Sequence, residues 1–200
     1  MGVTTVAPQR LILRVLQQAG QTLNREITRM ELVKLVYLVD YFYAQHTEGQ
    51  TLSGLGYIWD NHGPNAVGNA IVKRADWMEL TEGTIHIHET MNQMGNSKFL
   101  YRALEDVPVQ PIPDELAEAL IREVVRAYGP LGWSRLTSFA KKTRPMRGIS
   151  QGDPLDLTPT QRTNLVLRTI AARFAQGEYD TPGPRASLAE LRERSEQRAS

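Results

Sequence analysis

The chain has 200 residues, of which 41% are hydrophobic and 22% charged, a composition typical of a globular protein. A formal net charge of +1 gives no global attraction to nucleic acids or membranes, although a local basic patch stays compatible with it. The absence of cysteine excludes disulfides and thiolate metal sites, and no apolar run nears the roughly 20 residues needed to span a bilayer. The N-terminus shows no signal-peptide pattern, so we expect a cytoplasmic protein.

The first part of the chain predicts two helices. Residues 7–19 carry apolar side chains at helical spacing, and Gly20 is expected to end this helix. A second helix over residues 28–46 begins with a capping box of Thr28 and Glu31. Its apolar and aromatic residues lie on nearly all faces, namely Leu32, Val33, Leu35, Val36, Tyr37, Leu38, Val39, Tyr41, Phe42 and Tyr43. Because such a helix is typically buried, we expect it at the centre of the fold.

A polar corner with a Gly-Pro step follows in the sequence YIWDNHGPN, residues 57–65. Pro64 has a fixed φ and no N–H, which suits the first turn of a helix, so a helix is predicted from about Asn65 to Lys73. Gly63 relieves the steric crowding imposed on a residue that precedes proline. These residues explain the corner as a structural turn, while Trp59 and His62 would also suit the anchors of a protein interface. The two interpretations are compatible.

Residues 78–103 change to a strand pattern, in which Ile85 and Ile87 alternate with two histidines. Together with the later run KFLYRAL, this pattern predicts a small antiparallel sheet. We therefore expect an α+β fold that is mostly α-helical, with a helical domain around the central buried helix.

The second half of the chain predicts three more helices. The first is opened by Pro113 and ended by Gly129-Pro130, and the second covers the run WSRLTSFAKKT. A long helix is predicted from Thr158 to Phe174. We expect residues 1–180 to form a single domain, and residues 181–200 to form a charged C-terminal tail that is either flexible or docked on a partner.

Few residues of the chain are candidates for metal binding or catalysis. His86 and His88 share a strand face and such a pair can bind a metal, but the solvent-facing side of a hairpin explains them more simply. Nothing in the sequence pairs Asp40 or Asp60 with a partner for acid–base catalysis, and no phosphate loop, nucleophile elbow or His-Glu-x-x-His motif is present. We therefore expect no enzyme, no catalytic residue, no cofactor and no metal ligand.

A basic stretch lies near the end of the shorter helix and has two interpretations. It could contact phosphates, or it could be a solvated helix end whose cations favour the C-terminal dipole. The residues are Lys141, Lys142, Arg144 and Arg147.

The segment from the second helix to the corner resembles the Panacea domain, the family that includes SocA-like antitoxins. That family has a Lys-Leu-x-Tyr run on a helix, a loop, a short strand ending in an aromatic-Gly-Pro corner, and another helix. The matching residues here are Lys34, Leu35, Tyr37, Trp59, His62, Gly63 and Pro64. The resemblance covers roughly residues 8–175. It departs at Asn65, where the family usually has valine, and in the second half, where Leu136-Thr137-Ser138 and Arg144-Pro145-Met146 replace a Leu-Thr-His and a Pro-Trp.

The resemblance implies an antitoxin of a toxin–antitoxin system, which neutralises a cognate toxin protein by direct binding. The expected partner-binding residues are Tyr57, Trp59, His62, Gly63 and Pro64. A regulatory or proteolytic-adaptor module, including one associated with DNA, is the alternative, and a metal-dependent enzyme using the histidines is a third hypothesis. A protease and a second copy of the chain stay open as further partners, no membrane partner is expected, and nucleic-acid binding is left undecided.

Overall fold

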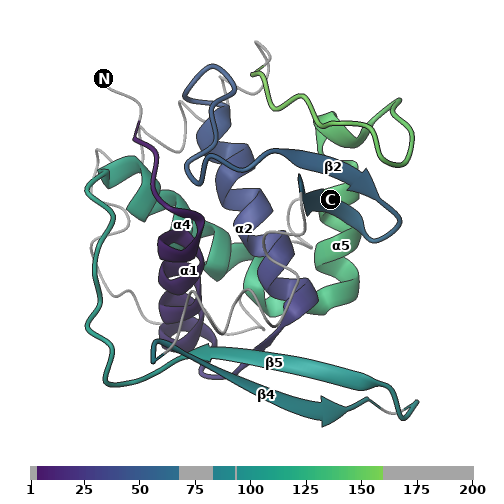
Figure 1. Cartoon of the computed structure of the whole chain (residues 1–200). Helices are drawn as coiled ribbons and strands as arrows, with labels where there is room; N and C mark the ends of the chain where they lie inside the picture. The colour runs from purple at the N-terminus through teal and green to yellow at the C-terminus, as the bar shows by residue number, and fades with distance from the viewer. Residues whose placement is uncertain (1–3, 68–82, 93, 160–200) are drawn as a thin grey trace, which may run out of the picture. The chain divides into compact units, whose positions relative to one another are not determined.

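The computed structural model describes residues 4–67, 83–92 and 94–159, and every structural statement concerns these residues. They combine α-helices with two small antiparallel sheets, so the α+β class is confirmed (Figure 1). The elements are α1 (Pro8–Leu23), β1 (Ile27–Thr28), α2 (Arg29–Ala44), β2 (Tyr57–Asp60), β3 (Gly63–Ala66), β4 (Ile85–Met91), β5 (Ser97–Ala103), α4 (Glu115–Tyr128), the 3-10 turn η2 (Gly129–Leu131), α5 (Gly132–Lys142) and the 3-10 turn η3 (Arg144–Met146).

Helix α1 extends beyond Gly20, which the sequence had suggested as its end. It ends at Leu23, where Asn24 adopts a left-handed conformation with a φ of 50° and donates its N–H to the carbonyl of Gly20 at 3.1 Å. Asparagine tolerates this conformation and here takes the place that glycine commonly has after a helix. The glycine is instead an internal helical residue.

Helix α2 begins with the predicted capping box. The Thr28 hydroxyl accepts the N–H of Glu31 at 3.2 Å, and the Glu31 carboxylate accepts the N–H of Thr28 at 2.7 Å. Leu35 and Val39 have 0% of their surface exposed, and Phe42 packs partly buried against the core. The helix contacts each of the other described helices and the strands β1, β3 and β5.

The predicted sheet is present as the β4–β5 hairpin, and it contains a third strand that the sequence did not indicate. Ile87 of β4 and Ile27 of β1 both pair with Tyr101 of β5, so the strand order is β1-β5-β4. The hairpin lies at one end of α1 and α2 (Figure 1). Strand β1 has only two residues, which is too short to show an alternating pattern.

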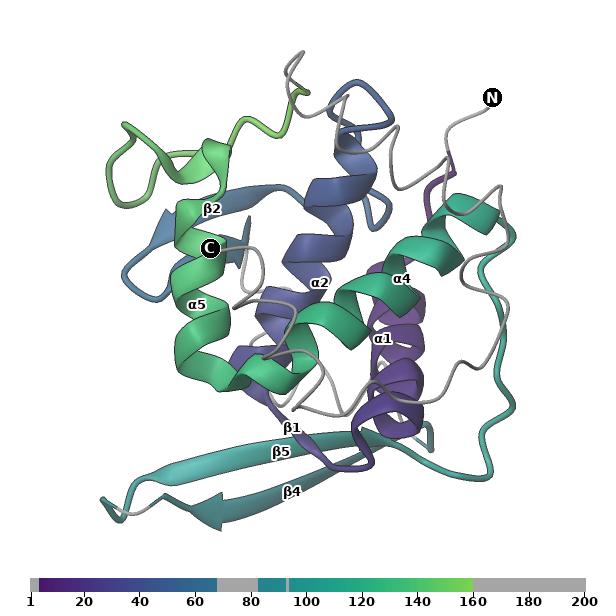
Figure 2. The same ribbon diagram turned by 180° about the vertical axis from the view of Figure 1, so that it is seen from behind.

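The helices α4 and α5 form a continuous unit with the 3-10 turn η2 between them. Asp114, not Pro113, is the N-cap of α4, and its carboxylate accepts the N–H of Ala117 at 3.0 Å. Helix α4 crosses α1 and α2, while α5 lies beside the β2–β3 hairpin (Figure 2). A methyl group added at Gly129 would come within 2.9 Å of the Leu23 side chain, so this glycine permits the close approach of η2 to the end of α1.

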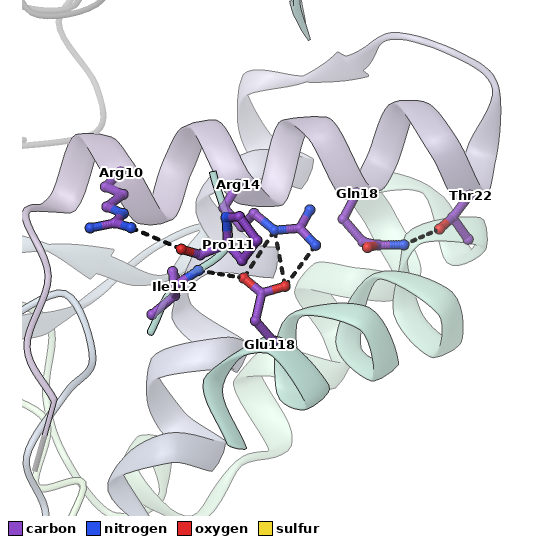
Figure 3. A network of polar contacts seen from close by, with 7 residues as sticks. All are labelled: Arg10, Arg14, Gln18, Thr22, Pro111, Ile112 and Glu118. Carbon is purple, nitrogen blue, oxygen red and sulfur yellow. Dashed lines mark hydrogen bonds and ion pairs between the residues drawn. The ribbon is translucent and has the colours of Figure 1, made fainter. Parts of the chain in front are cut away.

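A buried ion pair joins α1 to α4 (Figure 3). The Arg14 guanidinium donates to both carboxylate oxygens of Glu118, at 2.7 Å to Oε2 and 3.0 Å to Oε1. The same carboxylate accepts the N–H of Ile112 at 2.8 Å, and Arg10 donates to the carbonyl of Pro111 at 2.8 Å. The extended connector before α4 is thereby fixed to both helices.

Some expectations concern other parts of the chain. Outside the described residues lie the start of the strand pattern predicted at residues 78–103, most of the helix predicted at residues 65–73, nearly all of the helix predicted from Thr158, and the charged tail. Within the described ranges, none of the helices is long and apolar enough to cross a bilayer.

We expect Glu118→Gln to lower the free energy of unfolding by about 3 kcal/mol, because it leaves the buried Arg14 charge without its counter-ion. Glu123→Gln is the matched control, since its partner Arg126 is 60% exposed and such pairs contribute about 1 kcal/mol or less. Urea unfolding of both variants measures the difference. Equal effects of the two substitutions would contradict a structural role for the buried pair.

Candidate functional site

The Gly-Pro corner is a β-hairpin and does not begin a helix. Trp59 pairs with Pro64 and Asp60 with Gly63, so the predicted helix start at Asn65 is wrong: Asn65 lies within β3. The Asp60 carboxylate accepts the N–H of His62 at 3.0 Å, and Gly63 has a φ of 90°. A short turn followed by a glycine with positive φ is a common hairpin connection, and this local geometry outweighs the helix preference of proline at a first turn.

Lys34 fixes the second strand of this hairpin to α2. Its ammonium donates to the Pro64 carbonyl at 2.7 Å, although the residue is only 2% exposed. Burial lowers the pKa of Lys34 to about 8, with Asp60 opposing the shift and Lys141 adding to it. A methyl group built on Gly63 would lie 3.4 Å from Lys34 Cε, so a side chain at this position would be in van der Waals contact with the lysine.

The two tyrosines of this region belong to the interior. The Tyr37 and Tyr57 rings meet edge to face at a centroid distance of 5.1 Å, and the Tyr37 hydroxyl bonds the Thr143 hydroxyl at 2.7 Å. Tyr57 is 2% exposed and, like Gly63 and Pro64, is buried. These three expected partner-binding residues therefore offer almost no surface to a partner and act structurally in this conformation.

Asp40, which the sequence leaves isolated, is the acceptor of a buried cluster. Its carboxylate accepts the Tyr57 hydroxyl at 2.6 Å, the Ser53 N–H at 3.0 Å, and the Ser53 hydroxyl. Burial raises the pKa of Asp40 to about 6, while the bonds from Ser53 and Tyr57 counteract part of the shift. The partners lie 13 and 17 residues away, at no spacing that a local pattern reveals.

The exposed part of the corner is its turn. His62 is exposed and Trp59 is half-buried, with the backbone of Trp59 bonded to Asp153 and Gly152 on the side away from β3. Lys141 of the basic stretch donates to the Asn61 carbonyl at 2.6 Å. The turn is thus held from both sides while the His62 side chain stays accessible.

The two arginines of the basic stretch also donate to backbone carbonyls. Arg144 binds the carbonyl of Thr158 at 2.7 Å, and Arg147 binds that of Lys142 at 3.2 Å. Contacts within the chain therefore explain the positions of these two arginines.

The two strand histidines face a carboxylate that the sequence did not pair with them. Glu26 lies 3.6 Å from the His86 ring nitrogen and 3.1 Å from that of His88, and Arg102 approaches the same carboxylate at 3.6 Å. Both histidines are exposed, as expected for the outer side of a hairpin. Across the described ranges, no three His, Asp or Glu side chains are arranged to hold a metal ion.

Two adjoining hollows open beside the turn. The Lys34 cavity has a volume of about 230 Å³ and is lined by Arg29, Met30, Val33, Lys34, Asp60, His62 and Asn65. The Trp133 cavity has a volume of about 470 Å³ and is lined by Thr28, Arg29, Met30, His62, Asn92, Ser97, Lys98, Phe99 and Trp133. They share Arg29, Met30 and His62, so the two hollows adjoin each other.

Trp133 is the surface residue that the sequence did not single out. It stands in the first turn of α5 with 55% of its surface exposed, which is high for a large aromatic side chain. Only the fold brings it to the same hollow as His62, because the two lie in different elements.

Searches of protein-family models, curated protein sequences and solved structures find no match to this chain. The likeness to the Panacea domain therefore rests on the quoted residues.

We expect Gly63→Ala to destabilise the protein more than Gly152→Ala. Both glycines have a φ of 90°, so both substitutions carry the backbone strain of a left-handed alanine. The methyl group at Gly63 would meet Lys34 and Lys141 only at ordinary van der Waals distance, 3.4 Å, so sterics do not distinguish the two sites. Gly63 is, however, buried and paired with Asp60 in the hairpin, where the backbone cannot easily relax the strain, whereas Gly152 is exposed. Thermal unfolding of both variants measures the difference, and equal melting temperatures would show that the hairpin holds Gly63 no more firmly than the loop holds Gly152.

We expect Asp40→Asn to change how stability depends on pH. The pKa of Asp40 is about 6 in the folded state and 3.8 in the unfolded state, so the folded state binds the proton more tightly. The stabilisation of the fold by protonated Asp40 is therefore fully present below pH 3.8 and is lost as the pH rises through about 6. This loss amounts to about 3 kcal/mol. Urea unfolding at several pH values should show the variant gaining stability relative to wild type across this window, and a constant difference would contradict the buried carboxylate's role.

Proposed function

We propose that this chain is an antitoxin that binds a cognate toxin protein directly and neutralises it without turnover. The observation that carries the proposal is the meeting of the two motifs that resemble the Panacea domain. Lys34 donates to Pro64, and Tyr37 of the same helix packs on Tyr57 of the corner. Residues that are widely separated in sequence thereby form one structural unit, which supports reading them together as a motif.

The surface that we assign to the toxin surrounds the hairpin turn. His62 is exposed, Trp59 is half-buried, and Trp133 borders the same hollow as His62. Stable protein interfaces bury roughly 1,200–2,000 Å² in total, and a few aromatic anchors supply most of their binding free energy. Two tryptophans beside a fixed turn provide such anchors.

The proposal includes the wider arrangement expected from the sequence. It comprises a mostly helical domain around the buried helix at residues 28–46, action in the cytoplasm, and no requirement for a cofactor. The buried contacts of α2 support this part, since the helix supplies both Lys34 and Tyr37 to the corner.

Because antitoxins are usually encoded beside their toxins, the test is rescue of cells that express the product of the gene adjacent to this one. The full chain should restore growth, and a Trp59→Ala, His62→Ala double variant should stay folded by circular dichroism but lose rescue, because the anchors of the interface are gone. His46→Ala is the control, as this exposed histidine lies after α2, away from the turn.

Three results would count against the proposal or its surface. An adjacent gene product that is harmless when expressed alone would refute the antitoxin function. A folded double variant that still rescues would move the toxin contact away from the turn. An unfolded double variant would assign Trp59 to the core.

A further inference from the structure

We propose that the adjoining Lys34 and Trp133 cavities together bind a partner protein, with an acidic side chain of that partner at Lys34 and a neighbouring apolar side chain lying on Trp133. This inference deepens the proposed function and rests on it for the identity of the partner as a toxin. It adds the chemistry by which that partner is recognised.

The charges around the hollows favour a negatively charged group. Lys34 lines one hollow and Lys98 the other, and Asp60 is the one carboxylate among the lining residues of the described chain. A concave surface with more cations than carboxylates has a positive electrostatic potential, which attracts anions. The low-dielectric protein walls around it strengthen this potential.

Lys34 is the group to which the structure assigns the carboxylate. An ammonium has three N–H donors, and the hydrogen bond observed for it within the described residues uses one of them, on the Pro64 carbonyl. Because the side chain is almost fully buried, its charge lacks most of its hydration, and the lowered pKa reflects this cost. A carboxylate of the partner at the cavity would add to the counter-charge of Asp60 and would accept hydrogen bonds from the ammonium.

The occupant is a carboxylate of a protein rather than a phosphate or a small molecule. Asp60 stands beside Lys34 and repels a phosphate, which carries more negative charge, more strongly than a monoanionic carboxylate. Trp133 lines the hollow with 55% of its surface exposed, so a small ligand would leave much of the ring in water. A protein surface can cover Trp133 and Lys98 together while reaching inward to Lys34.

The probe is a library of phage-displayed random heptapeptides selected on the immobilised full chain. We expect selected peptides to carry Asp or Glu close to Trp, Phe, Leu or Met. Changing the acidic residue of a synthetic selected peptide to its amide should weaken binding by at least about tenfold, as should Lys34→Met in the protein, because each change leaves a charge without its partner. Trp133→Ala should weaken binding by a similar factor, and Lys142→Met, at the far end of α5, should not.

A double-mutant cycle, which combines the two peptides with the wild-type and Lys34→Met proteins, tests the contact even if Lys34→Met disturbs the hairpin. The acid-to-amide change is made in the peptide, so no folding defect of the protein can imitate it. In the Lys34→Met protein, the amide peptide should bind about as well as the acidic peptide, which shows that the two groups interact.

Several outcomes would overturn the proposal. These are selected peptides without an acidic residue, equal binding of acidic and amide peptides to the wild type, and an undiminished preference for the acidic peptide in Lys34→Met. Displacement of the peptide by succinate, inorganic phosphate or a single-stranded oligonucleotide at concentrations below the peptide's own Kd would assign the hollow to that other ligand class.

The peptide experiment needs no toxin, so it separates this inference from the proposed function. Peptide binding with the expected preference, but without any rescue of growth, would refute the antitoxin and keep the acidic-peptide site. Rescue that survives Lys34→Met and Trp133→Ala would place the toxin elsewhere and refute the inference.

Discussion

Helix α2 is buried along most of its length, so each polar side chain on it requires a partner from another part of the chain. Lys34 forms a hydrogen bond with the β2–β3 hairpin at Pro64, and Tyr37 forms one with Thr143, the residue that follows α5. Asp40 accepts a hydrogen bond from the loop at Ser53. Further along, Tyr43 reaches the N-terminal segment and the cap of α4, through Thr4 and Asp114. The need to satisfy these groups thus attaches five separate segments to one helix, and apolar packing alone would not set their positions so specifically.

This constraint explains which parts of the fold the sequence could predict. The start of α2, the β4–β5 hairpin, and the existence of α1, α4 and α5 follow from local patterns, because caps and side-chain periodicity act within a few residues. The sequence suggested a helix after Pro64, since proline suits a first turn. The structure has a strand there, because Gly63 adopts a positive φ and the Pro64 carbonyl is bonded by a lysine 30 residues earlier.

The candidate site also has a part that the sequence predicted and a part that only the structure shows. The sequence indicated Trp59 and His62, and the structure leaves both at least partly accessible. It also indicated Tyr57, whose aromatic character suits an interface and a core equally, and the structure places it against Asp40. The position of Trp133 and the adjacency of the two hollows depend on tertiary packing, so no spacing in the chain could have revealed them.

The turn that carries His62 is held at three points, which bears on how it can bind. Lys141 fixes the Asn61 carbonyl, the Asp60 side chain fixes the His62 N–H, and Lys34 fixes the strand that follows. A surface whose backbone is already ordered loses little conformational entropy when a partner docks. The desolvation cost of burying Lys34 is part of the same arrangement, because it keeps a charged group at the base of a hollow where an acidic partner would relieve that cost. Lys34 therefore both holds the hairpin in place and supplies positive charge to the hollow. A substitution of Lys34 acts on both the fold and the recognition of a partner.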